Sequence, residues 1–469
     1  MPKNGKKEAR MKLWVSAFVA ITIFGRLALS EAVYNEVLIP PSSSQELTIA
    51  TFQFPIGEPV TVVSGDFNND GYDELFLITE TNRPRMTVGP QGITFSPSPG
   101  YELRFWILHF RENGFGEPLL VDAISTPDQK VITGKHKPIV IDLDNDGNLD
   151  VVVLLFLETP PPENQLFGGF ETRLLIYWGQ GNCTFIQTEV FLELAYLPFI
   201  DFALYNHVAV GDFNSDGLLD LAFLDSRYVR LQILYNLGNR NFSDPEYVWV
   251  QLDEDECLPV PISIHAQKDV IIVAGLCGYS ENEFDFFVRT IKRSQQNGWE
   301  YSPLFLRNFR VKDAVDAIWD MEVADVNADG ELDILFFGPS ELADPSIPRF
   351  GPKYVGFYFV GLYLVKGKDY EKIAKPEFVA WVEKGTFLSV ETGVDGGMVI
   401  IVLPETGIRY KHLWVVSSSG PMTSSRTVGG RGHLVDGVLI NRSATRELIL
   451  LASVDFESEI TLINVLRGW

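Results

Sequence analysis

The sequence is poor in the residues that build most catalytic and redox centres. It has three cysteines and six histidines among 469 residues, and the histidines are scattered along the chain. Disulfides therefore cannot be the main framework of the fold. The chain also has no nucleophile elbow, no His-Glu-x-x-His helix, no phosphate-binding loop and no dinucleotide fingerprint. We therefore expect no enzyme of the classes that carry these motifs.

Positive charge is scarce as well. The chain has 38 Lys and Arg against 62 Asp and Glu, which gives a formal net charge of −24. Such a surface repels nucleic acid and anionic membranes, and it favours the binding of divalent cations. We therefore expect no nucleic-acid partner.

Long hydrophobic runs are missing except near the N-terminus. Five basic residues precede an apolar run at residues 13–24, and Ser30 and Ala32 have the spacing of a small-residue cleavage site. We expect residues 1–32 to be a signal peptide and residues 33–45 a linker, with no membrane span after signal removal. The alternative is an uncleaved membrane anchor, for which the run is short.

This N-terminus predicts a secreted protein, located extracellularly or at the cell surface. Three Asn-x-Ser/Thr sequons begin at Asn182, Asn241 and Asn441. In a eukaryotic secretory pathway they would be acceptors for glycans, so the protein would be a glycoprotein.

Turn formers and large apolar residues are abundant. The chain has 39 Gly, 27 Pro and 33 Phe, and 46% of its residues are hydrophobic. It can bury a large core and still interrupt it with many turns, which is typical of an all-β protein.

Four acidic segments of nine residues repeat along the chain, and each runs directly into a short apolar strand. They begin at Asp66, Asp142, Asp212 and Asp325. Because each segment joins two apolar strands, it is predicted to be the turn of a β-hairpin. The gap between the third and fourth segments is long enough for two units, so we expect a degenerate unit near residue 268.

Three eroded units complete the repeat. A shortened turn near residue 268, residues 394–397 and residues 439–447 each lead into an apolar strand without the full set of acidic residues. After most hairpins a further strand ends in a glycine or asparagine turn, so each unit holds about four strands. We therefore expect an all-β fold, a seven-bladed β-propeller of four-stranded antiparallel blades, over residues 46–469.

The acidic segments and their four-strand units resemble FG-GAP/VCBS repeats. This resemblance covers about residues 46–469 and implies a propeller similar to the N-terminal domain of integrin α subunits and of some seven-bladed lectins. It implies an extracellular, integrin-α-like binding role. The sequence has nothing after the propeller that corresponds to the rest of an integrin subunit, so integrin-type signalling is not implied.

The acidic segments have the spacing of calcium loops. Calcium takes six to eight oxygen ligands, and a short loop supplies them from side chains at positions 1, 3, 5 and 9 and from the carbonyl at position 7. Turn formation alone would explain one such segment, but not four dense clusters of carboxylates. We expect about four structural Ca²⁺ ions, and Mg²⁺ fits less well. The predicted ligands are Asp66, Asn68, Asp70, Tyr72, Glu74, Asp142, Asp144, Asp146, Asn148, Asp150, Asp212, Asn214, Asp216, Leu218, Asp220, Asp325, Asn327, Asp329, Glu331 and Asp333.

Long irregular loops offer a surface for a partner. Residues 81–100, 158–171 and 340–356 are rich in proline and carry arginines or aromatic residues. We expect a monomeric binding or cell-adhesion scaffold whose partner is an extracellular protein or a glycan, and no catalytic residues. The alternatives are a carbohydrate-binding lectin or a sugar-active enzyme on the same propeller, and loops that are merely tolerated insertions.

Two further expectations concern the missing strand of the last blade and a disulfide bond. The apolar segment at residues 46–54 is predicted to complete the last blade from the N-terminal side, because that blade lacks a fourth strand. A hairpin turn centred on Gln267 would place Cys257 opposite Cys277, which predicts a disulfide between them. The alternative is two buried free thiols.

Overall fold

The computed structural model describes most of the chain from residue 48 onward. The described residues are 48–82, 86–89, 92–95, 102–111, 114–125, 130–132, 137–158, 170–192, 208–225, 229–250, 258–280, 283–294, 298–302, 305–311, 321–326, 333–338, 359–365, 377–383, 385–392, 398–404, 412–418, 423–429, 433–442, 445–453 and 460–467. The expected signal peptide at 1–32 and linker at 33–45 lie outside them.

The described residues form β-strands and no helix, so none of them belongs to a helix that could cross a membrane. Most strands belong to antiparallel sheets in which four strands follow one another along the chain. Seven such sheets occur in the described residues, two of them with an additional fifth strand. The all-β, four-stranded architecture expected from the repeats is therefore present.

The strands of the first four sheets are given in their spatial order. The first sheet has β2 (Glu58–Gly65), β3 (Glu74–Thr81), β6 (Glu102–Leu108) and β9 (Leu119–Ser125). The second has β10 (Lys130–Ile132) and β11 (Ile139–Ile141), which both pair with β12 (Asp150–Glu158), then β13 (Phe170–Gly179) and β14 (Phe185–Leu192). The third has β15 (Val208–Gly211), β16 (Asp220–Asp225), β17 (Arg230–Leu234) and β20 (Glu246–Trp249). The fourth has β21 (Leu258–Gln267), β22 (Val270–Ser280) and β23 (Glu283–Arg293), with β24 (Trp299–Tyr301) and β25 (Phe305–Val311) both on β23.

Three more sheets and three small hairpins complete the described strands. The fifth sheet has β26 (Met321–Ala324), β27 (Asp333–Gly338), β28 (Phe359–Val365) and β29 (Glu377–Glu383). The sixth has β30 (Gly385–Thr392), β31 (Met398–Pro404), β32 (His412–Ser418) and β33 (Thr423–Gly429). The seventh has β34 (His433–Arg442), β35 (Thr445–Ser453), β36 (Thr461–Arg467) and β1 (Thr48–Phe54). The hairpins are β4 (Met86–Gly89) with β5 (Gly92–Phe95), β7 (Phe110–Arg111) with β8 (Gly114–Phe115), and β18 (Asn236–Gly238) with β19 (Asn241–Phe242).

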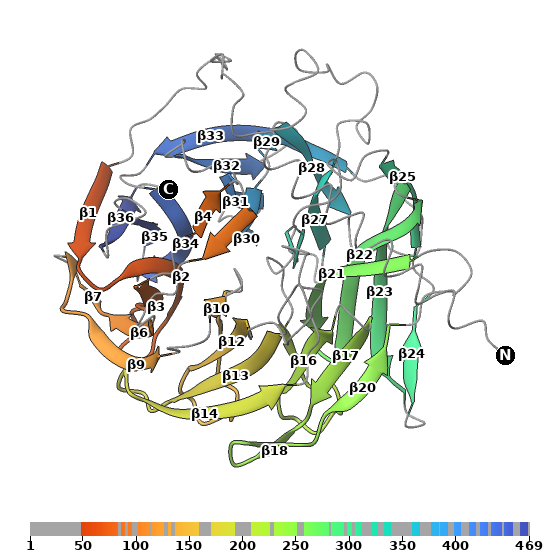
Figure 1. Ribbon diagram of the computed structural model, residues 1–469, viewed down its shortest axis with the longest axis horizontal. Helices are drawn as coiled ribbons and strands as arrows, with labels where there is room; N and C mark the ends of the chain where they lie inside the picture. Colours follow the sequence, from red (N-terminus) through yellow and green to blue (C-terminus); the bar gives the residue numbers. More distant parts are fainter. Residues whose placement is uncertain are drawn as a thin grey trace.

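The sheets lie side by side around a common centre (Figure 1). The first strand of each sheet is nearest the centre and contacts a neighbouring sheet: β2 contacts β11, β15 contacts β21, β21 contacts β26, β26 contacts β30, and β30 contacts β34. A shared apolar cluster joins the second and third sheets, and β34 of the last sheet contacts β2 of the first.

The short apolar runs that follow the acidic segments exist because the second strand of a sheet is covered on both faces. In β3, Phe76 and Ile78 face the cluster between the first and second sheets, whereas Leu75 and Leu77 face the cluster between the seventh and first. Side chains alternate between the two faces of a strand, so a strand that is covered on both sides carries successive apolar residues, as at residues 75–78. The remaining residues of β3, Glu74 and 79–81, are polar and buried as well.

The N-terminal strand completes the last sheet, as the sequence predicted for residues 46–54. β1 pairs antiparallel with β36, from Thr48 opposite Arg467 to Phe54 opposite Thr461. At the opposite edge of this sheet, the buried Asp436 of β34 accepts hydrogen bonds from the Thr61 hydroxyl at 2.7 Å and from the Val62 amide at 3.0 Å, both in β2. The two ends of the chain's repeat region are therefore joined by strand pairing and by buried polar contacts.

The strands on either side of each acidic segment and each eroded unit pair antiparallel, as expected of hairpins. Segments 66–74, 142–150, 212–220 and 325–333 lie between the first and second strands of the first, second, third and fifth sheets. The turn near residue 268 joins β21 to β22, residues 394–397 lie between β30 and β31, and β34 is followed directly by β35.

The predicted register of the fourth-sheet hairpin was wrong. Lys268 and Asp269 form its turn, with Lys268 at φ +56°, which displaces the pairing by three residues from the expected register; a bulge between Pro261 and Ser263 reduces this displacement to two. Cys277 consequently lies opposite Pro259 rather than Cys257. The geometric reason for a Cys257–Cys277 disulfide is therefore lost, and Cys257 itself lies outside the described residues. Cys183, the remaining cysteine, is buried and free.

Candidate metal-binding loops

Three acidic loops share one backbone conformation. We call residues 66–74, 142–150, 212–220 and 325–333 loops 1 to 4 and number the positions within each loop from 1 to 9. In loops 1 to 3 the residues at positions 4 and 6 have positive φ: Asn69, Asn145 and Ser215 near +60°, and Gly71, Gly147 and Gly217 near +86°. A Cβ added to any of these glycines would meet nothing within 4 Å. Glycine is therefore needed at position 6 for its backbone angle and not for space.

The same hydrogen bonds fold these loops around their first and fifth side chains. In loop 3, Asp212 accepts bonds from the amides of Asp216 at 3.0 Å and Gly217 at 2.9 Å, and Asp216 accepts one from the Leu218 amide at 2.8 Å. Loops 1 and 2 repeat all three bonds. The carboxylates at positions 1 and 5 are thus fixed by amides of their own loop.

The carboxylate at position 9 is buried and fastens each loop to its sheet. It accepts a hydrogen bond from the amide at position 2 in all four loops, at 2.8 to 3.2 Å. In loops 2 and 3 the other oxygen accepts a bond at 2.8 Å from the amide of Gly179 and of Asn236 respectively. Removal from water raises the pKa of Asp150 and of Asp220 to about 6, and the neighbouring loop carboxylates raise it further.

Loop 2 brings three carboxylates together. Oxygens of Asp142, Asp144 and Asp150 lie within 4.8 Å of one another. Oδ1 of Asp144 is buried and has no hydrogen-bond partner among the described residues. An unpartnered buried carboxylate oxygen is costly, and a cation among three carboxylates would compensate for it. Because every nearby donor is an oxygen, the residues of loop 2 fit a hard cation such as Ca²⁺.

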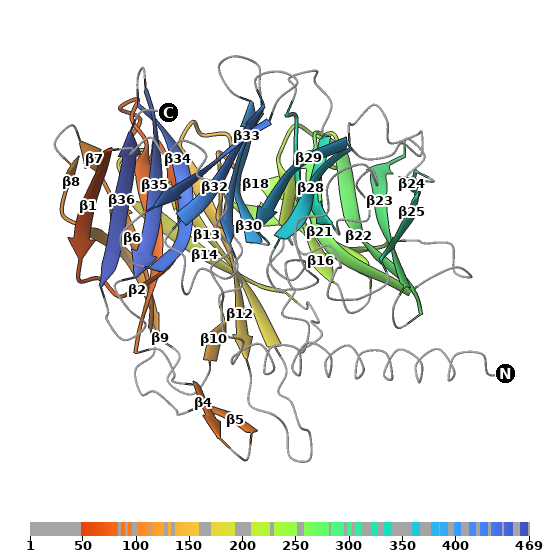
Figure 2. The ribbon, with the colours of Figure 1, turned by 90° about the horizontal axis from the view of Figure 1, so that it is seen from above.

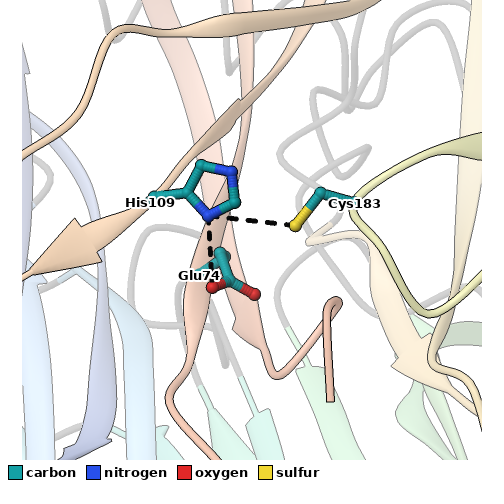
Figure 3. Close-up of side chains that lie close together, drawn as sticks. All are labelled: Glu74, His109 and Cys183. Atoms are coloured by element: carbon teal, nitrogen blue, oxygen red, sulfur yellow. Dashed lines mark hydrogen bonds and ion pairs between the residues drawn. The ribbon is translucent and has the colours of Figure 1, made fainter. Parts of the chain in front are cut away.

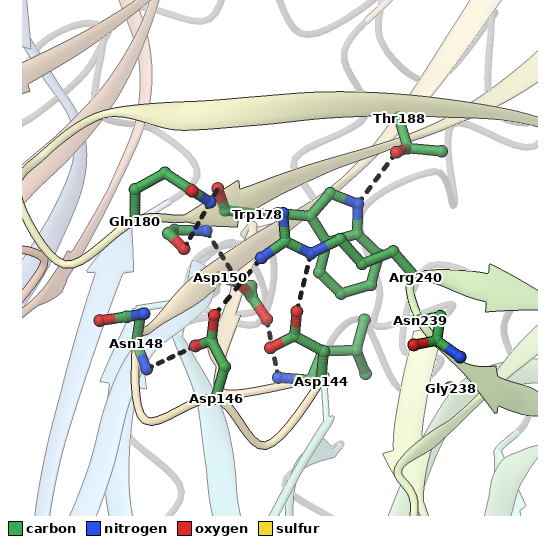
Figure 4. Close-up of polar contacts among 12 residues, drawn as sticks. Asp144, Asp146, Asn148, Asp150, Trp178, Gln180, Thr188, Gly238, Asn239 and Arg240 are labelled. Atoms are coloured by element: carbon green, nitrogen blue, oxygen red, sulfur yellow. Dashed lines mark hydrogen bonds and ion pairs between the residues drawn. The ribbon is translucent and has the colours of Figure 1, made fainter.

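Arg240 reaches loop 2 from the third sheet (Figure 4). Its Nε lies 2.8 Å from Oδ2 of Asp144, and its Nη2 lies 3.4 Å from Oδ2 of Asp146. The guanidinium also lies over the Trp178 ring, 5.4 Å from the ring centroid, and Trp178 is held by a 2.9 Å hydrogen bond to the Thr188 hydroxyl. A fixed positive charge therefore already faces the ligands at positions 3 and 5 of this loop.

Neighbouring loops contact one another. Asn69 of loop 1 donates a 2.8 Å hydrogen bond to Oδ1 of Asn148 in loop 2, and Asn145 of loop 2 donates a weaker one, at 3.4 Å, to the carbonyl of Gly217 in loop 3. Position 4 of one loop thus bonds position 6 or 7 of the next. The three loops form a continuous row on one side of the sheets.

The other predicted ligands are placed as follows. In loop 1, Asn68 donates to Asp70 at 3.1 Å and to Glu74 at 2.8 Å, and Tyr72 is exposed. In loop 3, Asn214 donates to Asp216 at 2.9 Å. In loop 4 only Asp325 and Asp333 are described, and Asn327, Asp329 and Glu331 lie outside the described residues.

Three residues at these loops were not predicted from the sequence: His109, Cys183 and Arg240. Cys183 and Arg240 occupy the same place in two matching turns, Gln180-Gly181-Asn182-Cys183-Thr184 and Leu237-Gly238-Asn239-Arg240-Asn241. Alignment of these two turns could have marked the position as one that reaches a neighbouring unit. Nothing in the sequence near His109 indicates its place.

The expected partner loops lie mostly outside the described residues. Within residues 81–100 the hairpin β4–β5 is described, and it projects beyond the sheets (Figure 2). Loop 158–171 is described only where it meets its strands, and loop 340–356 lies outside the described residues. The sequon asparagines Asn182 and Asn241 are exposed.

The comparison with protein families matches residues 142–223 to the FG-GAP-like repeat. This match begins at loop 2, runs through loop 3 and ends within β16. This part of the chain is similar to the FG-GAP-like repeat. The FG-GAP-like match therefore includes two of the three loops that share one backbone conformation.

Solved structures resemble this chain only weakly. The extracellular domains 1–2 of Drosophila Semaphorin 1b are 10% identical, with 87% of each chain covered and a TM-score of 0.38. The GH43_1 enzyme from Xanthomonas citri complexed with xylose is 11% identical, covering 56% of this chain and 86% of the enzyme at a TM-score of 0.30. Trypanosoma rangeli sialidase in complex with sialic acid is 11% identical, covering 90% and 60% at 0.31. The comparison with curated proteins finds no match.

Proposed function

We propose that the seven four-stranded sheets are the blades of one closed β-propeller. Contacts between the innermost strands of neighbouring sheets support this, and so does the apolar cluster shared by the seventh and first sheets. The pairing of β1 with β36 supports it most directly, because it joins the two ends of the repeat region in one sheet. Radial closure would protect the strand edges that an open sheet exposes.

Deletion of residues 46–54 tests this closure. The variant should unfold or aggregate, because β36 would lose its partner and Phe52 would leave the cluster that it shares with Phe115. A synthetic peptide of residues 46–54 should restore the melting temperature by adding the missing strand, whereas a scrambled peptide should not. A deletion variant that stays monomeric and melts like the full chain would refute the arrangement.

The acidic loops of this propeller each bind a structural Ca²⁺ ion. The observation that carries this proposal is the buried, unpartnered Oδ1 of Asp144 beside the carboxylates of Asp142 and Asp150. The common backbone of loops 1 to 3 extends the proposal to the other loops. At a tenfold excess of calcium over the dissociation constant, each site would add about 1.4 kcal/mol of stability.

Calorimetry with and without calcium tests whether the loops bind structural ions. EDTA should lower the unfolding temperature and excess Ca²⁺ should restore it. Asp216→Ala should remove about one bound ion, whereas Asp269→Ala, in the exposed turn of the fourth sheet, should remove none. Identical melting curves in EDTA and Ca²⁺ would refute the structural role.

The propeller serves as a secreted binding or cell-adhesion scaffold for an extracellular protein. Its signal-like N-terminus supports export, and the projecting β4–β5 hairpin supports a docking role for one of the three long loops. Cell-surface binding of the purified protein should saturate, and it should fall when a Gly-Ser linker replaces residues 84–97. The same linker in place of residues 295–297 is the matched control. Binding on a glycan array instead would favour the lectin alternative.

A further inference from the structure

Three side chains that could bind a metal converge where the first and second sheets meet (Figure 3). Glu74 is the first residue of β3, His109 follows β6, and Cys183 lies in the turn between β13 and β14. Nδ1 of His109 lies 3.4 Å from Oε1 of Glu74 and 4.0 Å from Sγ of Cys183. Ligand atoms of all three lie within 4.8 Å of one another.

The backbone holds Cys183 in an unusual conformation. Its φ is +60°, a region that Gly and Asn adopt more readily than cysteine. Its amide donates a 3.1 Å hydrogen bond to the carbonyl of Phe67 in loop 1, so the turn is fastened to the neighbouring sheet. The aromatic rings of Phe67 and Phe185 pack beneath it, with centroids 5.6 Å apart. A cysteine at a strained and firmly supported position is a reason to look for a role of its thiol.

The geometry is close to that of a tetrahedral metal site. With bond lengths of about 2.0 Å to nitrogen and oxygen and about 2.3 Å to sulfur, a tetrahedral ion would separate these ligand atoms by about 3.3 to 3.5 Å. The observed 3.4 and 4.0 Å require only a small movement of Cys183. The side chains of Glu74 and Cys183 are buried, whereas that of His109 is 24% exposed, which leaves a path for an ion to enter.

The donor set selects a different ion from that of the acidic loops. Ca²⁺ and Mg²⁺ prefer oxygen ligands alone, whereas imidazole and thiolate together favour Zn²⁺. Asn68 fixes Oε1 of Glu74 through a 2.8 Å hydrogen bond, and the Phe67 amide fixes Oε2 at 3.0 Å. These bonds orient the carboxylate, as hydrogen bonds to ligand side chains commonly do at zinc sites.

We propose that Glu74, His109 and Cys183 form a binding site for one Zn²⁺ ion, separate from the oxygen ligands of Asp66, Asn68 and Asp70. Three protein ligands leave a fourth position for water or for a group of a bound partner. Glu74 is also a predicted Ca²⁺ ligand of loop 1. Zinc at this site therefore alters calcium binding by loop 1 and leaves calcium binding by loops 2 and 3 unaffected.

Cobalt titration of the full-length protein in excess Ca²⁺ tests the site. Co²⁺ replaces Zn²⁺ readily and gives a thiolate-to-metal charge-transfer band in the near ultraviolet. The wild type should show this band at about one equivalent, and Zn²⁺ should abolish it. His109→Gln and Cys183→Ser should remove the band and weaken Zn²⁺ binding at least about tenfold. Cys183→Asn is a second variant, because asparagine suits a positive φ and supplies no thiolate.

Matched controls separate this site from other thiols and from the calcium loops. The double variant Cys257→Ser with Cys277→Ser should keep the band, and Asp216→Ala should keep it while it loses a Ca²⁺ ion. Absence of the band in the wild type would overturn the assignment. So would its survival in a folded Cys183→Asn variant or its loss in a folded double variant.

Discussion

The turns at residues 180–184 and 237–241 occupy the same place in successive sheets, yet they present different chemistry to the loop before them. Both contain a Gly-Asn pair followed by a residue at positive φ, Cys183 with +60° and Arg240 with +63°. Cys183 places a thiol beside Glu74 of loop 1, whereas Arg240 places a guanidinium on Asp144 of loop 2. The residue before each of them differs in conformation, since Asn239 has a φ of +52° and Asn182 has no positive φ, but the place of the tip residue in the turn is the same.

This difference shows that the contacts that fix the backbone of the repeat are not made by the side chain that sets its chemistry. The loop and the turn are fixed by backbone hydrogen bonds, such as those to the carboxylate at position 9, which do not depend on the residue at the tip of the turn. The tip residue can therefore change without loss of the fold. Loop 1 acquires nitrogen and sulfur donors, and loop 2 acquires a fixed cation.

The largest effect on stability is expected at Gly179, the last residue of β13, which precedes the turn at residues 180–184. At the equivalent position of the third sheet, Asn236 donates a 3.2 Å hydrogen bond to the carbonyl of Leu219. At Gly179 an added Cβ would lie 2.1 Å from the carbonyl oxygen of Leu149. Gly179→Ala should therefore lower the free energy of unfolding by about 3 kcal/mol or more, as measured by urea denaturation.

Gly298→Ala is the matched control for this change. A Cβ there would meet nothing within 4 Å. Its free energy of unfolding should stay within about 0.5 kcal/mol of the wild type. A Gly179→Ala variant as stable as Gly298→Ala would show that the second sheet accepts a side chain where the third sheet does.

The next effect distinguishes the two residues at position 9. Asp150 accepts bonds from two backbone amides, whereas Glu74 accepts one from a backbone amide and one from the part-exposed Asn68 side chain. Leaving two buried amides unpaired costs more than leaving one, so Asp150→Ala should lose about 2 to 4 kcal/mol in EDTA. Glu74→Ala should lose about 1 kcal/mol less. Equal losses of unfolding free energy in Asp150→Ala and Glu74→Ala would contradict this distinction between the two residues.

Much of the fold could be predicted because its rules are local. The Asp-x-Asn/Asp-x-Asp-Gly pattern between apolar runs located the hairpin turns, and the missing fourth strand of the last unit indicated the role of residues 46–54. The sequence has glycine at position 6 of each loop, and Gly147 and Gly217 have the positive φ that the turn requires there.

The remaining features depend on geometry that one sequence does not contain. The turn at Lys268 and Asp269 displaced the register of the fourth-sheet hairpin, and a bulge between Pro261 and Ser263 only partly offset it, so Cys277 is not placed opposite Cys257. His109 and Cys183 come from different sheets, and only the packing of those sheets brings them together. The contact of Arg240 with Asp144 has the same origin, since 96 residues separate them.

The smallest effect on stability, and the sharpest test of the comparison, is expected for Arg240→Gln. In EDTA the variant should lose about 1 kcal/mol, because a partly exposed ion pair contributes little. In calcium the change should be favourable: the guanidinium offsets the charge of Asp144 and Asp146, so its removal should raise the Ca²⁺ affinity of loop 2 about tenfold in isothermal titration.

Arg230→Gln is the matched control, because Arg230 pairs with Asp225 at 2.9 Å and lies over Tyr247, away from the loops. It should leave every calcium affinity unchanged. If Arg240→Gln weakened calcium binding instead, the guanidinium would support the loop rather than compete with the ion, and the two turns would differ in chemistry but not in their effect on calcium.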